Sequence, residues 1–295
     1  MASHRTTARA FLLLLLAGIF AGTAKAASVP DVTAFPVVGN VFYIDDFGAP
    51  RHQGAHEGND IMSLRHQPAV AFESGRVEKW ASPKGAVPSC MLVLHGKSGM
   101  TYWYIHLNND VTNGNDNDGG CRKAYAPGLE NGQHVRRGQL VAFVGDSGDA
   151  NGIQPHLHFE VHTAKGKPID PYEYLGRATP LLFPRPQAGL GDLTLKLKGT
   201  KVVAKTGSTI TVQTKRIVVS PLGLNYVNVR KVNLAVPPEA LVERKATGGR
   251  VGTTDLTSAR IGERARVTTT TFSPSWRKQR ARAGALAVAK VLLLG

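Results

Sequence analysis

Residues 35–175 consist of short runs rich in β-branched and aromatic residues, each ending at glycine, asparagine or aspartate, and this pattern restricts the segment to β-structure. The runs are VFYI (41–44), AVAFESGRVEKW (69–80), MLVLHG (91–96), MTYWYIHL (100–107), QLVAFVG (139–145) and HLHFEVH (156–162). No part of the segment repeats its apolar residues with a helical period over a useful length. We therefore expect an antiparallel β domain.

The C-terminal segment, residues 193–295, has a second strand pattern. Polar and apolar residues alternate with period two, and glycine or proline stands at the corners, as in a small β-barrel or sandwich. The stretch before it, residues 176–192, contains three prolines and three glycines, which suits a linker. The expected fold class is mainly β, with a first domain over 27–176, a linker over 177–192 and a β module over 193–295.

Charge and histidine divide the chain into two chemically different parts. The net charge of the whole chain is +15, but residues 1–176 have 15 Lys and Arg against 16 Asp and Glu. From residue 177 onward the chain has 21 Lys and Arg against 5 Asp and Glu. Nine of the ten histidines lie between His52 and His162. Catalytic chemistry is therefore expected in the first part and electrostatic binding in the second.

Residues 1–26 have the three parts of a secretory signal peptide. A basic start is followed by the ten-residue apolar run FLLLLLAGIF and by an Ala24-Lys25-Ala26 cleavage site. The run is too short to span a bilayer, so we expect a secreted or periplasmic protein of the cell envelope without a transmembrane segment in its mature form. An uncleaved anchor is the alternative. In an oxidising compartment Cys90 and Cys121 are expected to form a disulfide.

Two histidine motifs indicate a metal site. His56 and Asp60 form an H-x-x-x-D motif in which Gly58 lets the backbone turn, and His156 and His158 lie two residues apart in a strand. Catalytic zinc takes three protein ligands from histidine and carboxylate and keeps one position open. One histidine of the H-x-H pair can complete that set while the other stays free. A further histidine, His106, ends the strand 100–107 and is a candidate second base.

Segment 35–175 resembles the lysostaphin-type, LytM-like zinc metallopeptidases that cut peptidoglycan peptides. The resemblance is carried by FPVVGNVFYIDDFGAPR, HEGNDI, SGRVEKW, YIHLNND, NGQHVRRGQLVAFVGDSGDANG and QPHLHFEV. By position it implies that His56, Asp60 and His158 are the zinc ligands and that His106 and His156 are catalytic histidines which do not bind the metal. It also implies a narrow groove, walled by an antiparallel sheet and loops, for an extended peptide.

Several other residues have weaker assignments. Asn59 lies between two of the implied ligands and is a candidate to orient one of them or to contact substrate. Tyr104 and Tyr102 lie two and four residues before His106 and share its strand face, so they are candidates to line the groove, with core packing as the alternative. The remaining histidines of the domain are expected to be structural or exposed: His52, His66, His95, His134 and His162.

The expected function is that of an exported zinc metalloendopeptidase that hydrolyses peptide bonds in peptidoglycan stems or cross-bridges. Zinc-activated water would attack, His156 would move the proton and His106 would stabilise the oxyanion, although these two roles could be exchanged. The alternative is a non-catalytic binding or regulatory module of the cell envelope with the same fold.

The basic module 193–295 is expected to bind an anionic wall polymer or an acidic lipid surface. Nucleic acid is disfavoured because no nucleic-acid-binding signature accompanies the charge. Its densest basic stretch is Arg277–Arg282. Incidental charge on a solubilising module is the alternative.

Overall fold

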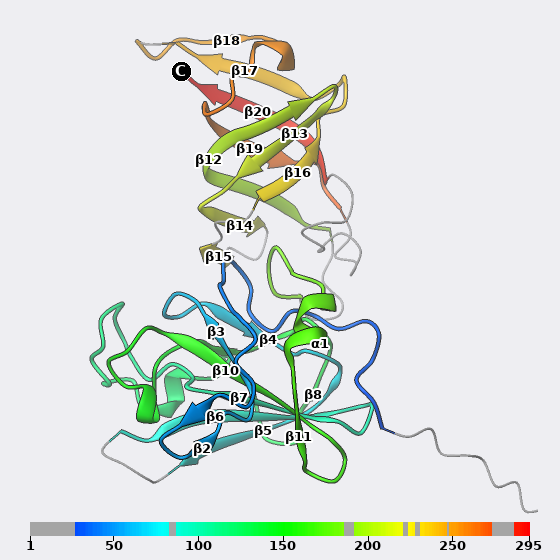
Figure 1. Ribbon diagram of the computed structural model, residues 1–295. Helices are drawn as coiled ribbons and strands as arrows, with labels where there is room; N and C mark the ends of the chain where they lie inside the picture. Colours follow the sequence, from blue (N-terminus) through cyan, green and yellow to red (C-terminus); the bar gives the residue numbers. More distant parts are fainter. Residues whose placement is uncertain are drawn as a thin grey trace, which may run out of the picture.

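The computed structural model describes residues 27–82, 87–185, 192–220, 224–227, 231–246, 248–272 and 286–295. The expected signal peptide and the basic stretch Arg277–Arg282 lie outside these residues. The described chain forms two β-rich units, which lie end to end in Figure 1. Among the described residues, no helix has the length and apolar character needed to cross a membrane. The mainly β fold class is confirmed.

The first unit is built on a seven-stranded sheet with the order β11-β10-β7-β6-β5-β8, in which β3 also pairs with β10. A two-stranded sheet, β4-β9, forms a separate layer. The strands of this unit are β1 (Pro50–Arg51), β2 (Gly54–Ala55), β3 (Asn59–Met62), β4 (Pro68–Val70), β5 (Gly75–Ser82), β6 (Ser89–Gly96), β7 (Thr101–Ile105), β8 (His134–Val135), β9 (Leu140–Phe143), β10 (His156–His162) and β11 (Pro168–Ile169). The short helix α1 (Tyr172–Arg177) follows.

The two faces of the large sheet have different roles. Phe72, Tyr102, Tyr104 and Phe159 are fully buried and pack ring against ring in the core on one face. Because side chains alternate along a strand, the neighbouring residues point to the opposite face. Ile105 of β7 lies directly opposite His158 of β10, so the metal motif of β10 lies on this second face of the sheet.

The structure joins Cys90 and Cys121 in a disulfide, with the two Cα atoms 5.2 Å apart, as the sequence predicts. The bond links the second residue of β6 to the start of the short 3₁₀ helix η1 (Cys121–Lys123). It therefore ties β6 to the residue that follows the loop 108–120.

The second unit is a closed barrel. Strand β12 pairs with β13, β13 with β16, β16 with β20, β20 with β19, and β19 with β12. The closure favours the barrel over the sandwich, the two forms expected from the sequence. The strands are β12 (Thr194–Thr206), β13 (Thr209–Gln213), β14 (Arg216–Ser220), β15 (Leu224–Val227), β16 (Lys231–Ala235), β17 (Leu241–Lys245), β18 (Val251–Thr253), β19 (Arg264–Thr269) and β20 (Leu286–Leu294), and a 3₁₀ helix, η3 (Leu256–Ser258), precedes β19.

Residues 181–185 touch both units. Leu181 is buried with Ala34 and Val38 in a small cluster of the first unit, whereas Leu182 and Phe183 are buried in the core of the barrel. Arg185 then donates its backbone N–H to the carbonyl of Gly138 at 2.6 Å. The first half of the expected linker is therefore packed against its surroundings.

Two of the predicted strands have different boundaries. Residues 41–44 form no strand: Phe42 makes one isolated bridge with Met62, and Phe42 and Ile44 are exposed. The predicted run 69–80 is divided between β4 and β5, because the chain turns at residues 72–74. Both departures arise where β-favouring residues lack a continuous partner strand.

Tyr104 is expected to stabilise the first unit through its hydroxyl. The group is buried, accepts a hydrogen bond from the backbone N–H of Phe72 at 2.8 Å and donates one to the carbonyl of Val70 at 3.0 Å. We expect Tyr104→Phe to lower the free energy of unfolding by about 1–3 kcal/mol, because it leaves buried backbone groups unpaired. Denaturant unfolding followed by tryptophan fluorescence measures this. Tyr172→Phe, at a half-exposed site, is the matched control, and equal effects of the two changes would contradict the assignment.

Candidate metal centre and active site

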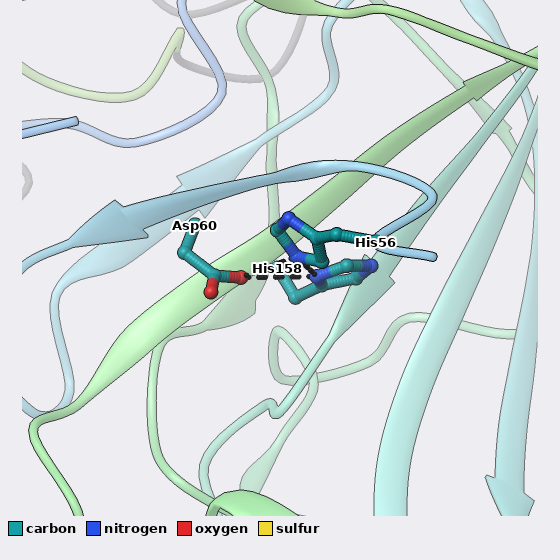
Figure 2. Close-up of side chains that lie close together, drawn as sticks. All are labelled: His56, Asp60 and His158. Atoms are coloured by element: carbon teal, nitrogen blue, oxygen red, sulfur yellow. Dashed lines mark hydrogen bonds and ion pairs between the residues drawn. The ribbon is translucent and has the colours of Figure 1, made fainter. Parts of the chain in front are cut away.

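Figure 2 shows three side chains that point toward one another from three places in the chain: His56, Asp60 and His158. His56 Nε2 lies 2.8 Å from His158 Nδ1 and 3.1 Å from Asp60 Oδ1. His158 Nδ1 lies 3.0 Å from Asp60 Oδ1. Two imidazole nitrogens and one carboxylate oxygen therefore meet at a single point, and all three could contact one metal ion.

Strand register brings two of these residues together. Strand β3 pairs antiparallel with β10, and Asp60 lies directly opposite His158. His56 precedes β3 and approaches the same point because the chain at Gly58 passes close to β10. A Cβ atom at Gly58 would lie 2.5 Å from the carbonyl oxygen of Phe159 and 3.0 Å from His158 Nε2. Only glycine fits this approach, which explains the central residue of the H-x-x-x-D motif.

Hydrogen bonds outside the cluster set the tautomers of both histidines. The Nδ1–H group of His56 donates to the carbonyl of Asp46 at 2.9 Å. The Nε2–H group of His158 donates to Glu160 Oε1 at 2.9 Å. Each neutral ring then presents the lone pair of its other nitrogen to the cluster. Two lone pairs and a carboxylate oxygen at these distances repel one another unless a proton or a cation lies between them.

The two oxygen atoms of the Asp60 carboxylate have different partners. Its Oδ1 atom faces the two histidines, while its Oδ2 atom accepts a hydrogen bond from Arg51 Nη2 at 2.8 Å. Arg51 also donates to Asp46 Oδ2 at 3.0 Å. Asp46 Oδ1 accepts a hydrogen bond from Asn59 Nδ2 at 2.8 Å. The surrounding side chains therefore fix the orientation of the carboxylate before any ligand binds.

The two carboxylates on either side of His158 control its charge. Burial alone would lower the pKa of His158, but hydrogen bonds with Asp60 and Glu160 outweigh it and raise the pKa to about 9. Burial would likewise raise the pKa of Asp60, but hydrogen bonds with His158 and His56 lower it well below its usual range. In the metal-free protein a proton on His158 therefore occupies the centre of the cluster, and a metal ion has to displace that proton.

The other two predicted site histidines lie beside this cluster. The ring centroids of His106 and His156 are 5.0 Å apart, and those of His106 and His158 are 5.9 Å apart. His156 Nε2 lies 3.8 Å from Asp60 Oδ1. His106 follows the end of β7 with a backbone φ of 58°, and this left-handed conformation ends the strand. All five of the predicted metal-binding and catalytic residues are thus brought together.

His106 and His156 carry their protons on the same ring atom. The Nδ1–H group of His156 donates to the carbonyl of Gln154 at 2.9 Å, and that of His106 donates to the carbonyl of Ser147 at 2.8 Å. With the proton on Nδ1, each ring can accept a hydrogen bond at Nε2. Burial, together with the nearby His156, lowers the pKa of His106 to about 4, so this ring is neutral at pH 7.

The prediction that Asn59, Tyr102 and Tyr104 line a substrate groove is wrong. Asn59, Tyr102 and Tyr104 are all 0% exposed, so none of them can touch a substrate. Asn59 instead donates to Asp46 and to the carbonyl of Ile44. The two tyrosines belong to the core face of β7, and the positive φ of His106 breaks the alternation that would have put them on its side.

One acidic residue behind the site was not predicted from the sequence, and its partner His162 was predicted only to be structural or exposed. Glu160 is 8% exposed and joins His158 to His162, whose Nε2 lies 2.6 Å from Glu160 Oε2. His162 is therefore a member of the site's outer network. The signal was present in β10, since residues 156, 158, 160 and 162 alternate with apolar residues and share one face. Asp46 and Arg51 had no comparable signal because they act from an irregular segment and a two-residue strand.

We expect His158 in the metal-free protein to remain protonated up to a pH of about 9. The ordinary pKa of a histidine is 6.5. The protonated His158 ring therefore stabilises the fold fully below pH 6.5, and this stabilisation is lost as the pH rises through about 9. Imidazole resonances followed by NMR over pH 5–10 measure the titration.

Glu160→Gln should move the pKa of His158 toward its ordinary value, because one of the two hydrogen-bonded charges is removed. Glu78→Gln is the matched control, since Glu78 pairs with His95 and not with the cluster. A wild-type His158 that titrates near its ordinary value would contradict the assignment of the hydrogen-bond network.

Comparison with known proteins identifies the domain that holds this site. Residues 54–171 match Peptidase family M23. A curated relative from Haemophilus influenzae, described as an uncharacterized metalloprotease, is 28% identical over 116 residues, which are 39% of this chain and 20% of the relative. The chain thus spans about a fifth of the length of that relative.

Three solved structures illustrate the similarity of the chain to known proteins. A protein from Ruminococcus gnavus assigned as the glycyl-glycine endopeptidase LytM is 26% identical, with 50% of this chain and 60% of that chain covered and a TM-score of 0.39. Csd3 from Helicobacter pylori is 24% identical, with 48% and 33% covered and a TM-score of 0.35. The catalytic domain of lysostaphin from Staphylococcus simulans is 20% identical, with 49% and 91% covered and a TM-score of 0.33.

The matched range contains all five residues of the site, His56, Asp60, His106, His156 and His158, and it confirms the resemblance inferred from the motifs. Residues 54–171, the part of the chain that holds the site, are therefore similar to peptidase family M23.

Proposed function

We propose that this chain is a zinc metalloendopeptidase that hydrolyses peptide bonds in the stems or cross-bridges of peptidoglycan. The observation that carries the proposal is the convergence of His56 Nε2, His158 Nδ1 and Asp60 Oδ1 within 2.8–3.1 Å of one another, beside two further histidines. The peptidase family supports the reaction class. The substrate class is inferred from the resemblance to lysostaphin-type enzymes.

The residues of the cluster suit zinc. Two neutral imidazoles and one carboxylate are a ligand set of catalytic zinc sites, and their separations allow one ion to contact all three at about 2.0–2.2 Å. Glu160 and Asp46 supply the outer hydrogen bonds that ligand histidines usually have. We therefore assign His56, Asp60 and His158 as the metal ligands. When bound, zinc would supply a water of lowered pKa and polarise the scissile carbonyl.

His156 and His106 would move protons around the scissile bond. With their Nδ1 protons held by backbone carbonyls, both rings can accept a proton at Nε2. We assign the first proton transfer to His156, whose Nε2 lies 3.8 Å from Asp60 Oδ1. A neutral His106 cannot donate from Nε2, so its assigned role as an oxyanion donor requires that it first receive a proton. The roles remain exchangeable between the two rings.

The substrate would lie on the second face of the large sheet. Trp103 lies directly opposite Glu160, and its ring centroid is 6.0 Å from that of His162 and 5.7 Å from that of Trp80. Trp80 is 47% exposed. These rings extend from the cluster across β7 to β5 and give the sheet a partly exposed aromatic surface. We propose that this surface, in place of the buried tyrosines, contacts the substrate.

We also propose that the enzyme acts outside the cytoplasm. The disulfide Cys90–Cys121 supports this location, because such bonds persist in oxidising compartments. The expected signal peptide at residues 1–26 is consistent with export.

The first test separates metal binding from catalysis. His158→Ala should lose both bound zinc and activity, whereas His156→Ala should keep zinc and lose about 10²–10⁴-fold in rate, because only a proton carrier is removed. New peptide termini in digested sacculi, detected by mass spectrometry with and without a chelator, and metal content by atomic absorption measure these effects. His134→Ala, at an exposed edge strand, is the control.

Loss of zinc from the His156→Ala protein would overturn the ligand assignment. Bound zinc without new termini from the wild-type protein would favour the non-catalytic envelope module over the peptidase.

The second test concerns the aromatic surface. Trp103→Ala should raise the KM for sacculus fragments about fivefold with kcat nearly unchanged, because a contact made equally in the ground and transition states is lost. Trp103→Tyr should restore much of the binding. Steady-state kinetics with equal zinc content in all proteins measure this, and a fall in kcat at constant KM would contradict a binding role.

A further inference from the structure

The outer face of the barrel carries cations at regular positions on three neighbouring strands. Lys196, Lys198 and Lys201 lie on β12 and are exposed, while the intervening Leu195, Leu197 and Thr200 are buried. Arg216 on β14 and Arg264 and Arg266 on β19 are exposed in the same alternating pattern. We call these six residues the basic face: Lys196, Lys198, Lys201, Arg216, Arg264 and Arg266.

Strand register puts like charges directly opposite one another on this face. Lys198 pairs with Arg216 of β14, and Lys201 pairs with Arg264 of β19. The register shift between Leu197 and Thr200 leaves Lys198 and Gly199 opposite Arg266. Directly opposed side chains lie about 4.5–5.5 Å apart at Cβ, and like charges at that distance destabilise a sheet. The fold therefore retains a repulsion between exposed like charges that contributes nothing to core packing.

Three of the acids of this region are engaged elsewhere. Glu243 pairs with Lys290 at 2.8 Å, and Glu263 pairs with Arg244. Asp255 accepts hydrogen bonds at the start of η3 from Thr257 and Ser258. Among the described side chains, no acidic group forms an ion pair with any of the six cations. The basic face thus lacks an internal counter-charge.

We propose that the basic face binds an extended polyanion of the cell envelope, a chain polymer that carries phosphodiester or carboxylate groups along its length. Cations repeat about every 5 Å across the strands and about every 7 Å along β12, so a chain with closely spaced charges can contact several at once. This binding would offset the repulsion between the opposed cations. The inference is independent of catalysis by the histidine cluster.

The side chains of the basic face suit a charged polymer better than a membrane or a nucleic acid. The exposed large apolar residues of the barrel, Leu241, Val251 and Ile261, lie outside β12, β14 and β19, so the described face has no apolar anchor for a bilayer. It likewise has no described aromatic side chain on which bases could stack. Membranes and nucleic acids therefore fit the face less well than a polymer of charged units.

The test compares two variants of equal charge. The face variant changes Lys198, Lys201, Arg216 and Arg264 to Gln, and the control variant changes Lys165, Lys167, Arg250 and Arg260 to Gln. Binding of each protein to poly(glycerol phosphate) and to poly-L-glutamate is measured by fluorescence anisotropy between 50 and 300 mM salt. The two polymers distinguish phosphodiester from carboxylate sources.

We expect the face variant to bind at least one polymer about tenfold more weakly than wild type at low salt, with a salt dependence flatter by about 0.7 per lost contact. The control variant should bind as wild type does. The face variant should also unfold at the same temperature as wild type or a higher one, because repulsion is relieved. A lower melting temperature would indicate a structural role for these cations and contradict the proposal.

Three other results would overturn the proposal. One is equal loss of binding in both variants, which would mean that net charge alone decides. Another is that wild type fails to bind either polymer. The last is tighter binding of wild type to vesicles containing phosphatidylglycerol, or to duplex DNA, than to both polymers.

Discussion

The pairing of β3 with β10 is the constraint on which the histidine cluster depends. It places Asp60 directly opposite His158 and Met62 opposite His156. Because side chains alternate along a strand, a shift of one residue would turn Asp60 into the core and bring Ile61 to the metal position. The buried face prevents such a shift, since Ile61 is fully buried and its exposure would cost about 1.5–3 kcal/mol. Core packing thus fixes the site geometry.

The same pairing requires a charge at the centre of the cluster. Asp46 and Glu160 each hold an N–H group of one histidine and so direct the other nitrogen inward. Their hydrogen bonds, together with Asp60, make the centre electronegative, and the raised pKa of His158 is the response of the metal-free protein. The residues that make the cluster a good metal site therefore also make it a good proton site, and metal affinity has to rise with pH.

The sequence predicts the composition of the site better than its surroundings. His56, Asp60, His106, His156 and His158 were found because two short motifs carry the chemistry and a family resemblance ties them together. The assignments of Tyr102 and Tyr104 failed because they assumed that strand alternation continues to His106, whose φ of 58° ends it. A positive φ at a histidine has no signal in a single sequence.

The hydrogen-bond network around the metal ligands contains residues that the sequence could have predicted and residues that it could not. Glu160 and His162 lie on the same face as the H-x-H pair, and alternation alone would have found them. Asp46 and Arg51 could not be found in that way, because their contacts with His56 and Asp60 depend on the path of the loop and the β1-β2 hairpin. Sequence patterns therefore predict residues that share a regular element and miss those that meet through irregular backbone.

The two units meet through a short packed segment. Leu181 belongs to a small cluster of the first unit, while Leu182 and Phe183 belong to the barrel core. Consecutive residues in two different cores leave little freedom between them, because a large hinge motion would expose buried apolar surface on one side. A polymer held by the barrel would then be held near the peptidase domain as well, and binding at one unit would raise the local concentration of substrate at the other. The first unit attracts an anionic polymer poorly on its own, since residues 27–176 have 12 Lys and Arg against 16 Asp and Glu.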